Sequence, residues 1–318
     1  MKSISKLSLA AAAFFAAALS SCFTGVESTP RIGQSEVRRN VPSGSAPERG
    51  FLDAVRPLPP ALWSSQGLAL RIDDERFRRL LAPGTSAPDV LKGRTVEFVS
   101  GAPAVSLTGE DATDLVFRDV RDAEFLILRL PVPFASLDTL SSLDIPFTID
   151  LGLVSRTDSI LAGRRLFIAT PDWYHPSGQS VFGLRHVEAV VDTVVPGTFL
   201  YPAAVYFSVP DTSLVSQGHK YFLYMSVGGV GAQARSFDRL FEFESPRRHH
   251  PEIDDDTWNC IVRSRIKEGM TPTECRLALG APSDIRRVPT RGGMRETWSY
   301  PDGVFLIFDD GMLTRFRQ

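Results

Sequence analysis

The sequence is short of cysteine, has no strong excess of charge, and contains no long apolar run after Leu19. Its 318 residues include three cysteines and carry a formal net charge of −2. A membrane-spanning helix needs about 20 apolar residues, and no segment beyond the first twenty-two provides them. Nucleic-acid binding would need a basic stripe, which the near-neutral charge does not supply. The two cysteines after residue 22 have no His pair beside them, so the pattern indicates no zinc site.

The first twenty-two residues have the layout of an export signal. Lys2 and Lys6 precede an apolar stretch, Leu7–Leu19, and the segment ends in Leu19-Ser20-Ser21-Cys22. The apolar stretch is too short for a permanent transmembrane helix and has the length of a signal-peptide core. A plain secretory signal that ends by chance at a cysteine is the alternative reading.

The Leu-Ser-Ser-Cys run resembles the lipobox of bacterial lipoproteins. The resemblance implies removal of residues 1–21 and attachment of palmitate-like acyl chains to Cys22 and its new amino terminus, so that the bilayer becomes a partner. Two or three chains give a lasting anchor, at about 0.8 kcal/mol per buried methylene. Phe23-Thr24-Gly25 lacks the Asp associated with inner-membrane retention in such proteins. The resemblance therefore implies the outer membrane, on its periplasmic face.

Residues 22–60 are predicted to be a flexible tether. Gly, Ser and Pro recur there without an apolar period, as in Val41-Pro42-Ser43-Gly44. A coil of about forty residues spans ~35 Å on average. After the leader is removed the formal charge falls to −4, because Lys2 and Lys6 leave with it.

Residues 61–245 are predicted to be a β-rich body, either an antiparallel barrel or a sandwich. The expected strands are rich in β-branched and aromatic residues and are bounded by Gly, Pro, Asp or Ser. Long amphipathic helices are lacking, which disfavours a parallel βαβ sheet. Two tandem modules with a boundary near residue 155 would explain why Leu91-Lys92-Gly93-Arg94 is echoed by Leu161-Ala162-Gly163-Arg164; a shared turn would also explain it. The expected strands are Gly67–Ile72, Arg94–Val99, Leu115–Phe117, Phe125–Leu130, Pro146–Leu151, Arg165–Ala169, His186–Val195, Ala203–Val209 and Tyr221–Val227.

Residues 246–318 are predicted to form a small α-α-β-β-β domain, which makes the whole chain α+β. Apolar residues at helical spacing predict a helix over Asp254–Glu268, which Gly269 ends. Thr271-Pro272-Thr273-Glu274 is a capping box for a second helix, which ends at Gly280. An antiparallel meander follows through short turns at Pro301-Asp302-Gly303 and Asp310-Gly311. Its expected strands are Ile285–Val288, Glu296–Tyr300, Val304–Phe308 and Met312–Phe316.

This C-terminal pattern resembles the BamE/SmpA/OmlA-type domain of small envelope lipoproteins. The resemblance is carried by Gly269-Met270-Thr271, Glu274, Leu279-Gly280-x-Pro282, Trp298-x-Tyr300 and Phe308-x-x-Gly311-x-Leu313. It covers residues 255–318 and implies two helices against a three-stranded antiparallel sheet. It also implies a non-enzymatic role in outer-membrane protein assembly or envelope integrity, with envelope proteins as partners.

Three motifs resemble functional sites, but each has a simpler structural interpretation. Gly229-x-Gly231-x-x-Ala234 lacks the acidic residue and the βαβ setting of a dinucleotide site. His249-His250 and the acidic residues after them suit a solvated linker and a helix start better than a metal site. Asp172, His175 and Ser177 could form a Ser-His-Asp site, but no Gly-x-Ser-x-Gly motif accompanies them. The sequence thus indicates no catalytic residue and no cofactor.

The candidate interaction residues are aromatic or lie in a glycine-rich loop. Trp173-Tyr174, Tyr201, Tyr221 and Tyr224 could line a surface for a glycan or a protein, or fill the core. The helical face of the C-terminal domain, or the loop around Arg291, is another candidate docking surface. Cys260 and Cys275 could form a disulfide in an exported protein or remain as buried thiols. The leading hypothesis is a protein-interaction or assembly factor; the alternative is an envelope glycan-binding protein.

Overall fold

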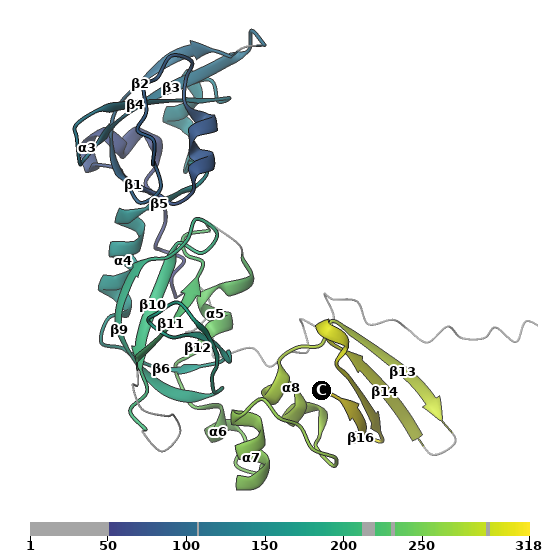
Figure 1. The fold of residues 1–318 in the computed structure, drawn as a ribbon. Helices are drawn as coiled ribbons and strands as arrows, with labels where there is room; N and C mark the ends of the chain where they lie inside the picture. The colour runs from purple at the N-terminus through teal and green to yellow at the C-terminus, as the bar shows by residue number, and fades with distance from the viewer. Residues whose placement is uncertain (1–50, 107, 212–219, 230–232, 291–292) are drawn as a thin grey trace, which may run out of the picture. The chain divides into compact units, whose positions relative to one another are not determined.

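The computed structural model describes residues 51–318 except 107, 212–219, 230–232 and 291–292 (Figure 1). The predicted signal peptide, Cys22, most of the predicted tether and Arg291 lie outside the described residues. Sixteen strands within the described residues form three sheets with antiparallel pairings, and none of these sheets closes into a barrel. The predicted α+β class with antiparallel sheets is confirmed. The described chain divides into two compact units, residues 51–280 and 281–318.

The first sheet of the unit 51–280 has five strands in the order β4-β3-β2-β1-β5. Alternate residues of its strands point into a core around Trp63, Phe77 and Phe117, all of them buried. The strands are β1 (Ala69–Ile72), β2 (Thr95–Val105), β3 (Asp111–Asp119), β4 (Phe125–Leu130) and β5 (Thr148–Asp150).

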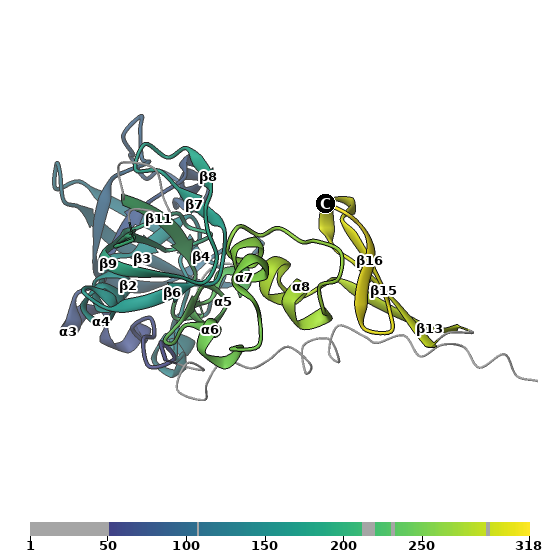
Figure 2. The same cartoon turned by 90° about the horizontal axis from the view of Figure 1, so that it is seen from below.

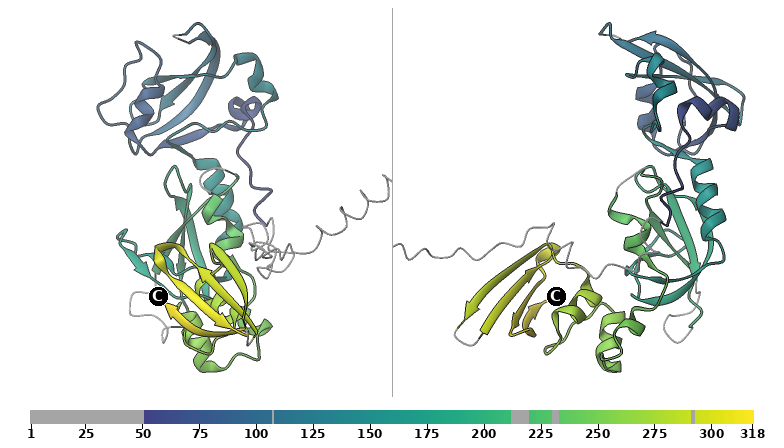
Figure 3. Two further views of the ribbon diagram at one scale, coloured as in Figure 1. Left: turned by 90° about the vertical axis from the view of Figure 1, so that its right-hand side faces the viewer. Right: turned by 180° about the vertical axis from the view of Figure 1, so that it is seen from behind.

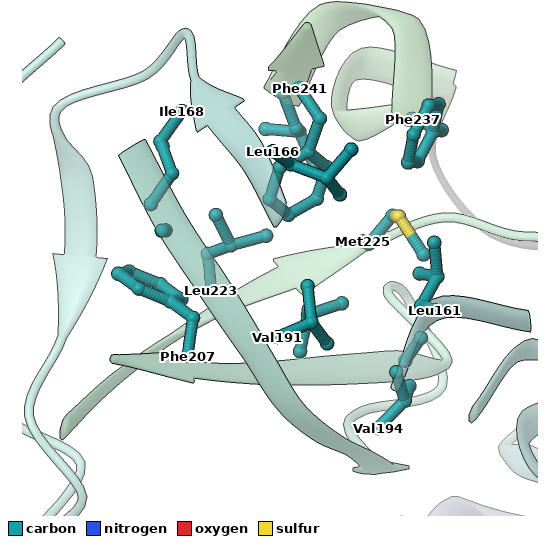
Figure 4. Close-up of a cluster of buried hydrophobic side chains, with 14 of the residues drawn as sticks. Leu161, Leu166, Ile168, Val191, Val194, Phe207, Leu223, Met225, Phe237 and Phe241 are labelled. Carbon is teal, nitrogen blue, oxygen red and sulfur yellow. The ribbon is translucent and has the colours of Figure 1, made fainter. Parts of the chain in front are cut away.

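The second sheet has seven strands in the order β12-β6-β9-β10-β11-β7-β8. Its inner face supplies a second core, in which side chains from the strands and from the neighbouring helices point toward one another (Figure 4). The strands are β6 (Arg165–Ile168), β7 (Asp172–Tyr174), β8 (Ser180–Phe182), β9 (Val187–Pro196), β10 (Ala203–Ser208), β11 (Lys220–Met225) and β12 (Phe241–Glu242).

An α-helix that the sequence pattern does not predict, α4 (Leu151–Leu161), joins the two sheets and packs along β9 (Figure 3). Asp150 begins it, because the Asp150 carboxylate accepts a hydrogen bond of 2.9 Å from the backbone N–H of Leu153. Gly163 follows its end with φ 78°.

The remaining helices of this unit are short (Figure 2). Glu274 and Thr271 make the reciprocal hydrogen bonds of a capping box at the start of α8, as predicted. The helix predicted over Asp254–Glu268 is shorter than expected and ends at Val262. The helices are α3 (Trp63–Gln66), α5 (Phe237–Leu240), α6 (Pro246–His249), α7 (Asp255–Val262) and α8 (Pro272–Leu279), with 3-10 turns η1 (Pro60–Leu62), η2 (Glu75–Leu80), η3 (Phe134–Thr139) and η4 (Gln233–Arg235).

The start of the described chain is already part of the folded body. The sequence predicts residues 51–60 as the end of the tether, but Leu52 and Val55 are buried in the core of the seven-stranded sheet. The Phe51 ring contacts the rings of Phe237 and Phe243, with centroids 5.0 and 4.9 Å away. The folded body therefore begins at residue 51 of the described chain and not at residue 61, because apolar side chains of this segment are buried.

The repeated Leu-x-Gly-Arg segment is a shared turn. In each copy the Arg backbone N–H donates to the Leu carbonyl, at 3.1 Å for Arg94 and 3.0 Å for Arg164. The glycines, Gly93 and Gly163, have φ of 85° and 78°, which a turn of this kind requires and which glycine adopts without strain. The two sheets that follow have different strand orders. A common turn explains the echo without a repeated module.

The unit 281–318 is a four-stranded antiparallel sheet in the order β13-β14-β15-β16. All four segments expected as strands take part in it, so the sheet has one strand more than the predicted α-α-β-β-β pattern and the resemblance allow. Ile285, Trp298, Leu306, Phe308 and Leu313 are the buried side chains of its strands. The strands are β13 (Asp284–Thr290), β14 (Gly293–Ser299), β15 (Phe305–Asp309) and β16 (Met312–Arg317), with the 3-10 turn η5 (Pro301–Gly303) between β14 and β15. The helices α7 and α8 belong to the other unit, so the predicted boundary at residue 246 does not coincide with the boundary between the units.

Candidate functional site

The residues that resemble a catalytic triad do not assemble into one. His175 Nδ1 lies 2.9 Å from Ser177 Oγ inside the turn that joins β7 to β8. The Asp172 carboxylate lies 3.9 Å from the Arg235 guanidinium, and no hydrogen bond joins it to His175 in the described part of the chain. A triad needs the carboxylate on the second ring nitrogen. The His175–Ser177 contact is a local turn contact.

The histidines at the junction after β12 each have an acidic neighbour. His249 Nε2 lies 3.5 Å from Glu244 and His250 Nδ1 lies 3.1 Å from Glu252. Across the described residues, no group of three or more His, Cys, Asp or Glu side chains is placed to hold a metal ion. These pairs are ordinary surface ion pairs if the imidazoles are protonated.

Cys260 and Cys275 are two separate thiols in the structure. Cys260 is half-buried on α7 and Cys275 is fully buried on α8. Burial, with a smaller effect of the neighbouring Glu274 carboxylate, raises the pKa of the Cys275 thiol to about 12. Cys275 therefore acts as a small apolar core residue.

Trp173 and Tyr174, which the sequence analysis groups together, lie on opposite faces of β7. Trp173 is 1% exposed, contacts the rings of Phe207 and Tyr221, and donates its indole N–H to the Thr170 carbonyl at 2.8 Å. Tyr174 is half-buried on the other face. Successive residues of a strand alternate between faces, so only Tyr174 is left for a surface role.

Tyr174 belongs to a group of aromatic side chains on the outer face of the seven-stranded sheet, which we call the aromatic face. Phe222 of β11 lies directly opposite both Tyr206 of β10 and Tyr174 of β7, so the three residues form one row across adjacent strands. Tyr224 lies two residues along β11 on the same side. Phe182, on the edge strand β8, shares this side with Tyr174 and is 71% exposed. The aromatic face consists of Tyr174, Phe182, Tyr201, Tyr206, Phe222 and Tyr224.

The rings in this row stack on one another. The Phe222 centroid is 4.9 Å from that of Tyr206 and 5.3 Å from that of Tyr174, with interplanar angles of 24° and 22°. Tyr224 meets Phe222 edge-on at 5.2 Å and lies nearly parallel to Tyr201 at 6.4 Å. Phe222 is therefore stacked between two rings, and Tyr206 and Tyr174 each turn one flat side toward it.

Charged side chains lie beside the aromatic face. The Arg235 guanidinium is 5.8 Å from the Tyr201 ring centroid and also lies next to Asp172. Burial raises the pKa of the Tyr224 phenol, and the phenols of Tyr174 and Tyr206 raise it further. The face thus combines phenol groups with an arginine and a carboxylate.

A separate shallow hollow lies where the two sheets of this unit meet, with an empty volume of about 420 Å³ that includes its open mouth. Apolar side chains such as Trp63 and Leu70 line it, together with Asp144 and Asp150. Loss of hydration raises the pKa of both carboxyl groups. Asp150 has a structural role there as the cap of α4.

Three residues of the aromatic face, Phe182, Tyr206 and Phe222, are not predicted from the sequence; Phe182 is exposed, Tyr206 is half-buried and Phe222 is only 4% exposed beneath its neighbours. The signal for Tyr206 and Phe222 is the alternation along β10 and β11, where every second residue faces outward. Tyr221, which the sequence analysis includes, falls on the inner side and packs against the core. No protein-family model, no curated protein and no solved structure matches this chain.

Proposed function

We propose that the protein is a lipid-anchored envelope protein that works without catalysis, by binding another envelope protein through the aromatic face. The observation that carries the proposal is the group of aromatic side chains on the outer face of the seven-stranded sheet, together with the ring of Phe182, which is 71% exposed on the edge strand of the same side. Tyrosine and arginine dominate binding energy at protein interfaces, because each offers a large contact area together with hydrogen-bonding groups.

The packing of the rings favours a protein partner over a glycan. A sugar ring binds by laying its C–H groups on an open aromatic face. Here the flat sides of Tyr206, Phe222 and Tyr174 are turned toward one another at 4.9 and 5.3 Å. Phenol groups of half-buried tyrosines and the Arg235–Asp172 pair suit the polar rim of a protein interface.

The C-terminal residues that carry the BamE-like resemblance have folding roles. Thr271 and Glu274 cap α8, Gly280 ends it with φ 85°, and Trp298 is fully buried. These roles support the proposal of a BamE-like fold over residues 255–318. Because each of them stabilises a fold and none presents a docking surface, we place the partner on the aromatic face.

The membrane attachment in this proposal depends on Cys22. The lipobox-like run supports acylation there, and the absence of Asp after the cysteine supports the periplasmic face of the outer membrane. Within the described residues, no helix is long and apolar enough to span a membrane.

Site-specific photo-crosslinking in growing cells tests the proposed partner. A photoreactive phenylalanine analogue at position 182 is expected to give adducts with one or a few envelope proteins. The matched control is the same analogue at Phe125, which is 55% exposed on β4 of the other sheet and should give no such adducts. Equal adducts at both positions, or adducts at neither, would contradict the proposal.

A second variant measures the contribution of the exposed ring. Phe182→Ser removes an exposed side chain, so thermal stability should be unchanged, while recovery of the crosslinked protein in affinity isolation should fall about tenfold or more. Phe125→Ser is the control and should recover that protein normally. Full recovery with Phe182→Ser would remove Phe182 from the interface.

A further inference from the structure

His186 is a buried histidine that belongs to no sequence motif. It lies between β8 and β9 in the left-handed region, with φ 56°, and its side chain is 5% exposed. Its backbone N–H donates to the Ile168 carbonyl of β6 at 2.6 Å. The backbone is therefore fixed to the seven-stranded sheet, and the imidazole is held in one place.

Both ring nitrogens of His186 face hydrogen-bond acceptors. Nδ1 lies 3.1 Å from Oε2 of Glu242, on β12, and Nε2 lies 3.0 Å from the backbone carbonyl of Leu277, on α8. A carboxylate and a carbonyl can only accept. A neutral imidazole has one N–H, whereas the imidazolium has two. Only the protonated ring donates to both partners.

The position of Leu277 at the end of a helix also favours a protonated His186 ring. Leu277 lies in the last turn of α8 (Pro272–Leu279), where the backbone carbonyl groups have no hydrogen-bond partner within the helix. This turn is also the negative end of the helix dipole. A cation at this end is stabilised by the dipole as well as by the hydrogen bond. The imidazolium would thus lie between a carboxylate and the negative end of a helix.

Two arginines on the surrounding elements, Arg185 and Arg247, bind other partners, and Arg165 of β6 pairs with Glu188 of β9 at 2.8 Å. Arg185 donates from Nε to Ser264 Oγ at 3.1 Å and from Nη1 to the Ala169 carbonyl. On α7, the Trp258 ring lies 6.0 Å from the imidazole, and the Arg247 guanidinium packs over that indole and pairs with Asp255. On α8 itself, Arg276 and the buried Cys275 come just before Leu277. Glu242 is thus the carboxylate in direct contact with the ring.

We propose that a proton on His186 fastens the last turn of α8 to the seven-stranded sheet, so that this attachment weakens as the pH rises. The protonated ring bridges Glu242 and Leu277 at low pH. Loss of the proton removes one of the two donors and leaves one acceptor facing a bare nitrogen lone pair. This device does not depend on which partner the protein binds.

The neighbouring residue provides an internal reference. The Arg185 backbone N–H donates to the Val262 carbonyl at 2.8 Å, and its side chain reaches Ser264, so it holds the end of α7. A guanidinium keeps its proton at every pH at which the protein is folded. We therefore expect α8 to loosen with rising pH while the end of α7 stays attached.

Hydrogen exchange of the full-length chain in detergent, from pH 5.5 to 8.5, tests this. After correction for the intrinsic pH dependence of exchange, protection of the α8 amides should fall about tenfold, as expected for loss of a hydrogen bond to a charged group, while α7 keeps its protection. His186→Gln should remove the pH-dependent part. His175→Gln, which changes a histidine in the β7–β8 turn, should retain it. Equal changes in α7 and α8, or a normal pH response in His186→Gln, would overturn the proposal.

If His186→Gln folds poorly, the protonation of the His186 ring can be measured directly in the wild-type protein. Nitrogen-15 NMR of the wild-type imidazole should show both nitrogens protonated at pH 6 and one deprotonated at the pH where α8 loosens. Glu242→Gln keeps an acceptor oxygen but removes the negative charge, and it should move that transition to lower pH. A ring with one bare nitrogen throughout pH 5.5 to 8.5 would contradict the proposed bridge.

Discussion

At the scale of single residues, the two thiols should differ sharply in reactivity. The pKa of about 12 that burial gives Cys275 leaves about one thiolate in ten thousand at pH 8, and only the thiolate is alkylated. Iodoacetamide at pH 8 should therefore modify the half-buried Cys260 and leave Cys275 unmodified in the folded protein. Peptide mass spectrometry measures both sites.

The same experiment tests the disulfide alternative. Unfolding in guanidinium without reductant should make both thiols reactive. If neither reacts until a reductant is added, the two cysteines are bridged. Cys260→Ser is the matched control, because it should abolish labelling within residues 51–318 of the folded protein and leave Cys275 as the one reactive site of that part when it is unfolded.

Sequence patterns place single residues correctly where the neighbours along the chain decide the environment. Thr271 and Glu274 are three residues apart and make the predicted capping box. His186 could not be predicted in this way, because its partners Glu242 and Leu277 lie 56 and 91 residues further along the chain. The burial of Trp173 likewise depends on contacts with Phe207 and Tyr221, which the sequence does not order in space.

At the scale of elements, the cap of α4 carries a prediction about charge. Burial raises the pKa of Asp150 above its ordinary value, so the folded state favours the protonated carboxyl and the ionised form opposes folding as the pH rises through the folded-state pKa. Asp150→Asn keeps a side-chain oxygen for the Leu153 N–H and removes the charge. We expect this variant to be more thermally stable than the wild type at pH 7 and equal to it at pH 3.

The matched variant Asp150→Ala separates the cap from the charge. It removes the acceptor of the Leu153 N–H, so it should lose about 1 kcal/mol of unfolding free energy relative to Asp150→Asn at every pH. Thermal unfolding followed by circular dichroism measures both variants. If Asp150→Asn were less stable than the wild type at pH 7, the Asp150 charge would be net stabilising.

Strands with a strong local sequence pattern can be predicted, whereas very short strands and helices of low intrinsic propensity cannot. Each of the nine strands expected in the β-rich body overlaps a strand of the structure, from β1 to β11. The missed strands, β7, β8 and β12, have two or three residues each and depend on pairing with longer neighbours. The helix α4 contains Gly152 and several β-branched residues, which lower helix propensity; its packing against β9 stabilises it instead.

At the scale of the whole molecule, the boundaries follow packing rather than composition. Residues 51–60 look like a linker, but Leu52 and Val55 reach the core of the seven-stranded sheet. Val262 of α7 joins that same core, and Arg185 and His186 bind the ends of α7 and α8. These long-range contacts explain why the helices belong with residues 51–280, although the local pattern groups them with the C-terminal strands.

The anchor gives the last prediction. With its own signal, the protein should sediment with membranes and be released by detergent, because the acyl chains proposed for Cys22 would each bury many methylenes at about 0.8 kcal/mol apiece. Export with an ordinary cleavable secretory signal and Cys22→Ala should leave the protein in the soluble periplasmic fraction. Cys260→Ala, with the native signal, is the control and should stay with the membranes.

If the Cys22→Ala protein stays with the membranes, a second variant shows whether a protein partner holds it there. If a membrane-embedded partner holds it through the aromatic face, adding Phe182→Ser should release it, because that change removes the most exposed ring of the face. If the double variant is also retained, neither acylation nor the aromatic face accounts for the membrane location, and both parts of the proposed function fail. Release by Cys22→Ala alone shows that the lipid supplies most of the membrane affinity, and the aromatic face then contributes partner selection at the membrane.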